Sequence, residues 1–397
     1  MRLTAAKLAQ AVELVKAAGV DVWLTFVRET AEGGDPVLPL ILEGGLTWHS
    51  ALMVSASGRK VAIVGNYDAD PLVQSGDWDE VVPYVQGITE PLLRELEAMC
   101  GAKPKIAVNY SLDDVKSDGL SHGMYLQLEQ MFAGTRFGGS LVSAEPIVSR
   151  LRGVKTPVEI ERMVRAIEET DRLFEFIESM ARPGITERQI YDAVQQRIDA
   201  LGYGYAWDRA GDPIVNCGPD SVVGHGVPSA TLALAPGHLL HVDLGVIVDG
   251  YASDLQRCWY LGDAVPDSLR HACDAVVGAI RAGFEALKPG VAGWTVDAAA
   301  RSYLTAQGYP EYLHALGHQV GRVAHDGGTL LGPRWERYGK TPFQLIEPNQ
   351  VYTLELGVAV EGIGYVSLEE MVQVTETGCR WLSTPQTEIR LLGTPTP

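Results

Sequence analysis

Two 21-residue segments in the second half of the chain share one pattern, and this repetition constrains the fold most strongly. PGITERQIYDAVQQRIDALGY (residues 183–203) and PGVAGWTVDAAARSYLTAQGY (residues 289–309) agree at six offsets, from the initial Pro-Gly to the final Gly-Tyr. Each segment follows a long helical pattern and precedes strand-like sequence. Recurrent helix-capping chemistry is one explanation for such matches. We favour two related helix–helix–strand units that form one pseudo-symmetric domain, with a site between the halves that collects ligands from both.

The first 150 residues instead alternate between helical and strand-like segments, which predicts a compact α/β domain with a mostly buried sheet. The expected elements are a helix over 4–18 that ends at Gly19, a strand over 21–27, a hairpin over 50–64 that turns at Ser57-Gly58, a helix over 91–100 and a strand over 105–109. We find no catalytic constellation here. His49, Asp68 and Asp70 are interpreted as structural or surface residues.

The two parts are expected to join within SRLRGVKTPVE, residues 149–159. Thr156 can cap a helix, Pro157 suits its first position, and Glu159 completes a capping box. This helix should run to about Met180. The sequence therefore predicts a second domain over residues 156–397.

Composition excludes several classes of function. The net charge is −18, from 50 acidic and 32 basic residues, whereas a nucleic-acid partner needs a basic face. No run of 18 apolar residues is present to cross a membrane. The five cysteines form no C-x-x-C pair, which favours free thiols in a reducing compartment. We therefore expect a cytoplasmic protein without nucleic-acid or membrane partners.

Two aspartates lie in an otherwise apolar region, HVDLGVIVDGYASDLQRCW, residues 241–259. Asp243 follows Leu239, Leu240 and Val242, and Asp254 comes 11 residues later, beyond a turn. Two strands joined by that turn could bring the carboxylates side by side. A carboxylate buried in a strand needs a cation or hydrogen-bond donors. Capping of turns is the alternative interpretation for this pair.

Three of the nine histidines lie close together in HALGHQVGRVAHD, residues 314–326: His314, His318 and His325. Histidine is a common metal ligand and proton carrier. Gly317 and Gly321 flank His318 and are expected to let the backbone approach a ligand closely. A single histidine is more often a core residue, but three in a glycine-rich segment favour function.

Glutamates interrupt two further apolar segments, Glu355 in YTLELG and Glu369 in the strand pattern over 365–375. Alternation places Glu369 on the face opposite Leu368 and Glu370. Asp243, Asp254, His318, Glu355 and Glu369 together carry too much negative charge for one cation. Such a set of oxygen ligands with one nitrogen suits two ions about 3.5–4 Å apart. Mn²⁺, Co²⁺, Fe²⁺ and Zn²⁺ all fit it.

The order and spacing of these five residues resemble those of the pita-bread metallopeptidases. This family includes methionine aminopeptidase, Xaa-Pro aminopeptidase and Xaa-Pro dipeptidase (prolidase), with creatinase as a metal-free relative. The match covers residues 156–378, and the preceding α/β domain resembles that of creatinase and the proline-specific peptidases. The resemblance implies an α+β fold: a creatinase-like α/β N-terminal domain (1–150), a pita-bread catalytic domain (156–397), and a homodimer.

The resemblance also implies a role for each site residue. Asp243 binds one metal ion, Asp254 and Glu369 bridge two, and His318 and Glu355 complete the set. The ions are divalent, Mn²⁺ first, with Co²⁺ or Zn²⁺ as alternatives. The residues implied in substrate binding and catalysis are His225, His314, His325 and, as proton shuttle, Glu355.

The implied reaction is hydrolysis of the Xaa-Pro bond, most simply in dipeptides, by a hydroxide that bridges the metals. The proline-specific enzymes commonly have arginine where this chain has Ser367, and proline where it has Leu356. Arg322, Arg334 and Arg337 are candidate cations for the carboxylate of a dipeptide. The alternatives are an Xaa-Pro aminopeptidase on longer peptides, a creatinase-like amidinohydrolase, and a non-catalytic binding protein on the same fold.

Overall fold

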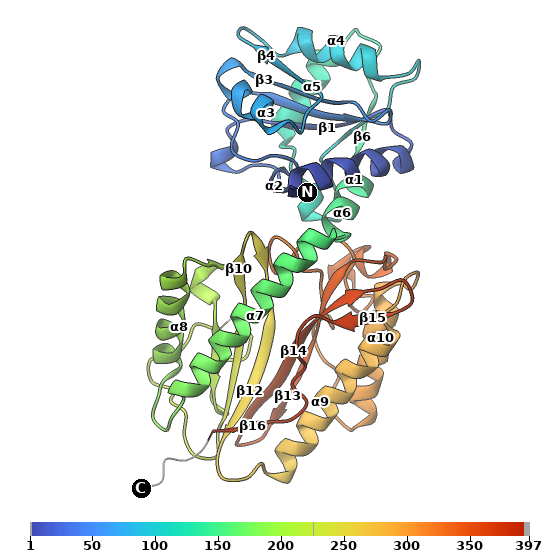
Figure 1. The fold of residues 1–397 in the computed structure, drawn as a ribbon. Helices are drawn as coiled ribbons and strands as arrows, with labels where there is room; N and C mark the ends of the chain where they lie inside the picture. Colours follow the sequence, from blue (N-terminus) through green and yellow to red (C-terminus); the bar gives the residue numbers. More distant parts are fainter. Residues whose placement is uncertain (1, 225, 393–397) are drawn as a thin grey trace. The chain divides into compact units, whose positions relative to one another are not determined.

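The computed structural model describes residues 2–224 and 226–392 (Figure 1). The chain divides into two compact units, Met1–Arg152 and Gly153–Pro397, and each is described by itself. Within the described residues, no helix is both long enough and apolar enough to cross a membrane.

The first unit is built on a six-stranded mixed sheet in the order β4-β3-β2-β1-β5-β6. Strand β2 is antiparallel to both β1 and β3, whereas the β3–β4, β1–β5 and β5–β6 pairs are parallel. Its strands are β1 (Val22–Val27), β2 (Ser50–Ser55), β3 (Lys60–Gly65), β4 (Glu80–Tyr84), β5 (Ile106–Val108) and β6 (Leu141–Ser143). Its helices are α1 (Leu3–Ala18), α2 (Leu38–Ile41), α3 (Ala69–Ser75), α4 (Thr89–Met99), α5 (His122–Phe132) and α6 (Glu145–Gly153), with short 3₁₀ turns at Thr30–Glu32, Asn66–Asp68 and Val115–Ser117.

Two hydrophobic clusters cover the two faces of this sheet. Side chains of α1, α2 and α6 pack on one face, and side chains of α4 and α5 pack on the other. Burial on both faces explains the nearly continuous apolar strands. The expected helices, strands and hairpin are confirmed within one or two residues, and Gly19 ends α1 in the left-handed conformation, φ 64°.

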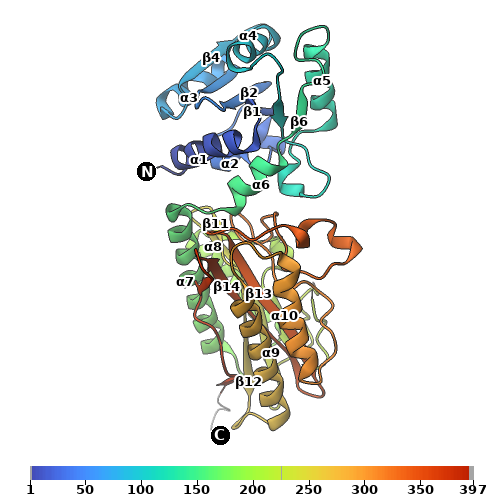
Figure 2. The ribbon, with the colours of Figure 1, turned by 90° about the vertical axis from the view of Figure 1, so that its right-hand side faces the viewer.

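The second unit contains a seven-stranded sheet and two pairs of long helices (Figure 2). Its helices are α7 (Pro157–Met180), α8 (Glu187–Leu201), α9 (Asp267–Ala286) and α10 (Gly293–Ala306), and its 3₁₀ turns are Arg209–Gly211, Glu336–Tyr338 and Thr341–Phe343. The large sheet contains β8 (Ile214–Cys217), β9 (Leu239–Leu244), β12 (Leu255–Leu261), β13 (Val351–Val360), β14 (Gly364–Val374), β15 (Cys379–Trp381) and β16 (Arg390–Leu392). A small sheet contains β7 (Gly204–Tyr205), β10 (Val246–Val248) and β11 (Tyr251–Ala252).

The strands of the large sheet follow the order β13-β14-β12-β9-β8, with β15 beside β14 and β16 beside β12. Helices α7 and α8 contact the β8 and β12 side of this sheet, and α9 contacts β13 and β14. Leu354, Leu356 and Leu368 join the core with α9. Because side chains alternate along a strand, Glu355 and Glu369 point to the opposite face.

The predicted pair of helix–helix–strand units is present as α7–α8–β8 and α9–α10–β13. Both repeated segments contain the second helix of a pair and a left-handed glycine after it, Gly202 (φ 71°) and Gly308 (φ 87°). The Glu159 carboxylate accepts from the Thr156 backbone N–H at 2.6 Å, as expected for the start of α7.

Candidate metal centre

Four polar side chains form a row across four neighbouring strands on the face opposite the helix-covered core. Asp243 on β9 is paired with Gln256 on β12, Gln256 with Glu369 on β14, and Glu369 with Glu355 on β13. Directly paired residues point to the same face. Register alone therefore brings together residues that lie more than 100 positions apart in the sequence.

Asp254 joins this row from the position directly before β12. It lies two residues before Gln256, so both side chains occupy the same face. Asp254 is only 5% exposed, and Glu369 is 1% exposed. In the antiparallel β9–β12 pair, Asp243 lies opposite Gln256, two residues after Asp254.

His318 reaches the row because its segment pairs with the free edge of β13. The Thr353 N–H donates to the His318 carbonyl at 2.9 Å, and the Glu355 N–H donates to the Leu316 carbonyl at 2.7 Å. A Cβ on Gly317 would lie 2.0 Å from the Thr353 oxygen. The close approach at Gly317 is therefore to the β13 backbone, and an approach to a ligand stays a prediction for this residue. At Gly321 a Cβ would meet the Asp326 carboxylate instead.

The imidazole of His318 faces three carboxylates. Its Nε2 lies 3.5 Å from Glu355 Oε1, 3.7 Å from Asp254 Oδ2 and 4.0 Å from Glu369 Oε1. Ligand atoms of Asp254, His318 and Glu369 all lie within 4.8 Å of one another. Side chains from β12, β13, β14 and the histidine segment therefore converge on one small volume.

Burial and mutual repulsion make the ionised form of these carboxyl groups costly. Burial first, and the charge of Glu369 second, raise the pKa values of Asp243 and Asp254 well above the usual range. Burial and the charge of Asp243 raise the pKa of Glu355 to about 8, and burial and Glu355 raise the pKa of Glu369. Burial lowers the pKa of His318 to about 3, which keeps the imidazole neutral and able to bind a cation.

The residues present fit divalent metal ions. Asp243 Oδ1 and Glu369 Oε1 are buried and accept no hydrogen bond from any described residue. Four carboxylates and a neutral imidazole, without a thiolate, form a ligand set for Mn²⁺, Co²⁺, Fe²⁺ or Zn²⁺. Bound cations would satisfy the free oxygens and remove the repulsion that raises the pKa values.

Sequence reasoning missed two polar residues on the same face. The Gln256 amide donates to Glu369 Oε2 at 3.0 Å and Glu355 Oε2 at 3.2 Å, and its oxygen lies 3.0 Å from His241 Nε2. Tyr365 lies four residues before Glu369 on β14, and burial and Glu355 raise its pKa to about 12. Alternation from Asp254 and Glu369 would have indicated both positions.

Of the other three predicted site histidines, the two that the structure describes differ in their position relative to the carboxylates. The His325 ring packs edge-on against His318, with ring centroids 4.2 Å apart. His314 is exposed beside Tyr312, with ring centroids 5.7 Å apart. His225 lies outside the described residues.

The candidate cations for a substrate carboxylate already have contacts of their own. The Arg334 guanidinium stacks on Trp294 at 4.4 Å, and Arg322 lies 5.2 Å from the centre of the Tyr251 ring. Arg337 donates to the Leu313 carbonyl at 2.7 Å, one residue before His314.

Comparison with known proteins places this architecture in a family. A model of metallopeptidase family M24 matches residues 161–376, which is more than half of the chain. The chain belongs to metallopeptidase family M24. This family depends on divalent metal ions and acts on peptides, so the chain is a metallopeptidase by family.

Relatives of this M24 chain extend over nearly its whole length. An uncharacterized peptidase of Staphylococcus saprophyticus is 28% identical over 330 residues, 83% of this chain and 86% of the relative. The structure resembles the Xaa-Pro dipeptidase from Bacillus anthracis (TM-score 0.74, 24% identity, 97% of this chain and 99% of that chain). It also resembles the X-Pro aminopeptidase from Thermotoga maritima (TM-score 0.71, 23% identity, 97% and 99%). The predicted α+β pita-bread fold is confirmed.

Proposed function

We propose that this M24 metallopeptidase hydrolyses the Xaa-Pro bond of dipeptides. The observation that carries the proposal is the group of carboxylates that faces His318, of which Asp254 and Glu369 are buried, and which suits a metal-dependent hydrolytic centre. Solved structures of similar fold include an Xaa-Pro dipeptidase and an X-Pro aminopeptidase. The complete ligand set argues against the metal-free creatinase-like and non-catalytic alternatives.

Two divalent ions, with Mn²⁺ as the first choice, are proposed to bind Asp243, Asp254, His318, Glu355 and Glu369. When bound, such ions activate water as a nucleophile near neutral pH and polarise the scissile carbonyl. Asp254 and Glu369 project from the centre of the row, between Asp243 and the His318–Glu355 pair, and this place suits carboxylates that bridge two ions.

The surrounding side chains are proposed to bind substrate and move protons. Glu355, whose Oε1 lies 3.5 Å from His318 Nε2, would take a proton and pass it to the leaving imino nitrogen of proline. His325, whose ring packs against that of His318, would donate a hydrogen bond to the developing oxyanion. The exposed His314 and the expected His225 would contact the substrate.

Preference for dipeptides requires a cation for the free carboxylate of proline, because Ser367 cannot supply one. The Ser367 hydroxyl donates to the Leu356 carbonyl at 3.3 Å and carries no charge. Arg337 reaches the segment next to His314, so it is the stronger candidate, and Arg334 is the weaker one. A bidentate arginine–carboxylate contact would select dipeptides over longer chains.

Kinetics on three substrates test the proposal. Mn²⁺-loaded protein should cleave an Xaa-Pro dipeptide with a kcat/KM at least tenfold above that for its carboxyl amide or the matching Xaa-Pro tripeptide. Arg337→Ala should remove this discrimination, whereas Arg334→Ala, at the weaker candidate, should leave it intact. Equal rates on all three substrates would identify an Xaa-Pro aminopeptidase instead. Full activity in chelator would contradict the metal-dependent proposal itself.

A further inference from the structure

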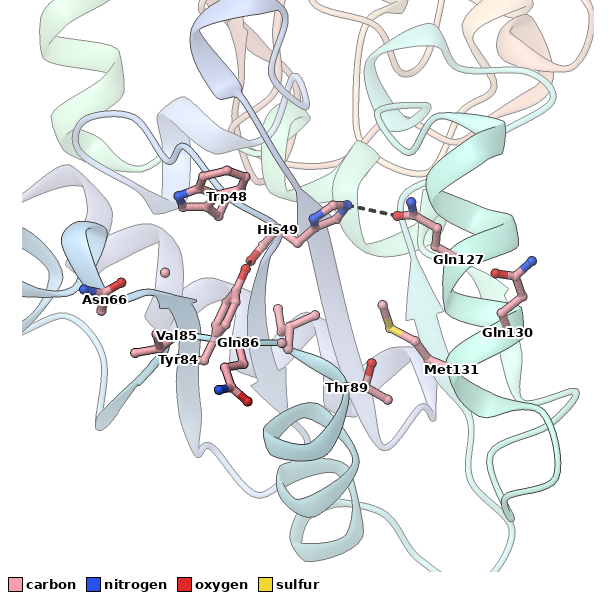
Figure 3. Close-up of a pocket in the computed structure, with 13 residues that line it drawn as sticks. Trp48, His49, Asn66, Tyr84, Val85, Gln86, Thr89, Gln127, Gln130 and Met131 are labelled. Carbon is pink, nitrogen blue, oxygen red and sulfur yellow. Dashed lines mark hydrogen bonds between the residues drawn. The ribbon is translucent and has the colours of Figure 1, made fainter.

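A cavity in the first unit is lined by residues of that unit alone, none of which belongs to the metal centre. It has a volume of about 690 Å³ and is formed at the carboxyl ends of β3 and β4, the start of β2, and the facing ends of α4 and α5 (Figure 3). This volume falls within the range of small-molecule and peptide sites, roughly 300–1,000 Å³. The ends of parallel strands are also a common position for ligand binding in α/β units.

The lining of this cavity carries no formal charge. None of its 13 lining residues, all of them described, is Asp, Glu, Lys or Arg, although these four types make up 21% of the chain. His49 is the one histidine among them, and its Nε2 lies 3.0 Å from Gln127 Oε1. A charged ligand group would find no partner here, so the lining favours an uncharged ligand.

Two aromatic side chains give the cavity a fixed apolar wall. Trp48 is 57% exposed, yet its ring rests on the bare backbone of Gly65, where a Cβ would lie 2.9 Å from Trp48 Cδ1. The Tyr84 hydroxyl donates to the His49 carbonyl at 2.8 Å and holds that ring beside the opening. Exposed aromatic rings can stack on flat or saturated rings, and the contact of Trp48 with Gly65 and the hydrogen bond of Tyr84 limit the conformational entropy that binding would cost.

The polar part of the wall consists of side-chain amides. Asn66, Gln86 and Gln130 stand on different sides of the cavity, and all three are exposed (Figure 3). Each carboxamide offers two N–H donors and one acceptor, which matches the alternating carbonyl and N–H groups of an extended peptide. The indole N–H of Trp48 adds a donor of the kind that aromatic grooves use toward polyproline II carbonyls.

We propose that this cavity binds short, uncharged, proline-containing peptides as a site separate from the metal centre. A pyrrolidine ring would stack on Trp48, and the carboxamides of Gln86 and Gln130 would bind the neighbouring backbone. The proposal does not require the peptidase function proposed above, because it concerns binding to the first unit only.

Calorimetric titration of the full-length chain tests the site. The probe is Ac-Ala-Pro-Pro-Ala-NH₂, whose blocked ends carry no charge, and Asp254→Asn in the background prevents turnover. We expect a Kd below about 1 mM, and at least about tenfold weaker binding by Trp48→Ala. Tyr67→Ala is the matched control, because Tyr67 is 87% exposed near Asn66 but does not line the cavity. Its affinity should equal that of the background protein.

Titrations with two other peptides test which property of the ligand the cavity recognises. Ac-Ala-Gly-Gly-Ala-NH₂ and Ac-Asp-Pro-Pro-Asp-NH₂ should each bind at least tenfold more weakly, since the first lacks the ring and the second carries charge. If Trp48→Ala unfolds the first unit, Trp48→Phe and Gln130→Ala replace it in the titration. Gln130→Ala should then weaken peptide binding. The proposal is overturned if no peptide binds, if Tyr67→Ala weakens binding equally, or if maltose binds in place of the peptide. It is also overturned if Trp48→Ala changes the sedimentation coefficient, because a second copy of the chain would then cover this face.

Discussion

Replacing Glu369 by glutamine should stabilise the metal-free protein and weaken its response to metal. Glu369 is 1% exposed, and a ligand atom of Asp254 lies within 4.8 Å of one of its own. In wild type the Gln256 amide donates a hydrogen bond to Glu369 at 3.0 Å. A glutamine at position 369 keeps an oxygen that can accept this hydrogen bond but removes the negative charge. The substitution therefore separates electrostatic repulsion from hydrogen bonding.

The size of the effect follows from this separation. Two unit charges 4.8 Å apart repel by about 3.5 kcal/mol at an effective dielectric constant of about 20. Because the raised pKa values show that protonation already relieves part of this repulsion, we expect a gain of about 1–2 kcal/mol. For a unit of this size that gain corresponds to an increase in Tm of about 2–8 °C.

Thermal unfolding in chelator and in Mn²⁺ measures both parts of the prediction. Wild type at about 100 times its Kd for Mn²⁺ should gain about 2.7 kcal/mol, and Glu369→Gln should gain less than half of this. Glu370→Gln is the matched control on the opposite face, where Arg257 Nη1 contacts Glu370 Oε1 at 3.0 Å. It should lower the free energy of unfolding by about 3 kcal/mol with or without metal, because buried Arg257 loses its nearest carboxylate and keeps only that of Asp171, at 3.7 Å.

The reasoning is refuted if Glu369→Gln lowers the Tm in chelator while Mn²⁺ stabilises it as strongly as wild type. Glu369 would then be a structural acceptor, and the buried carboxylates would not form a repelling cluster.

Three further predictions concern the same centre. Gln256→Leu should weaken Mn²⁺ binding about 10–100-fold in calorimetry, because Glu355 and Glu369 lose their shared donor; unchanged affinity would contradict that positioning role. His325→Ala should lower kcat/KM about 100-fold at unchanged metal content, whereas lost metal would make His325 a ligand. In chelator, the free energy of unfolding should fall as pH rises from about 4.5 to about 8, because the folded chain holds a proton on Glu355 that the unfolded chain releases. Equilibrium denaturation at several pH values measures this fall, and an equal fall in Mn²⁺-loaded protein would contradict it.

Much of the fold is predictable because local patterns agree with the tertiary contacts. Gly19 and Gly202 end helices in the left-handed conformation that glycine adopts most easily, so helix ends are readable from the sequence. The strand pattern over 365–375 also predicts the face of Glu369, since alternation is a property of the strand itself. The candidate metal ligands are recognisable for a related reason: charged residues are rare in segments that are otherwise core.

The tertiary structure decided which of these side chains meet and what supports them. Gln256 was missed because an amide in a strand has no unusual local signal, and its role depends on strand pairing with β9 and β14. The close contact of Gly317 is with the carbonyl of Thr353, 36 residues later in the sequence, and no local pattern indicates such a partner. Local periodicity fixes which face a residue occupies, but only the register between distant strands determines its neighbours.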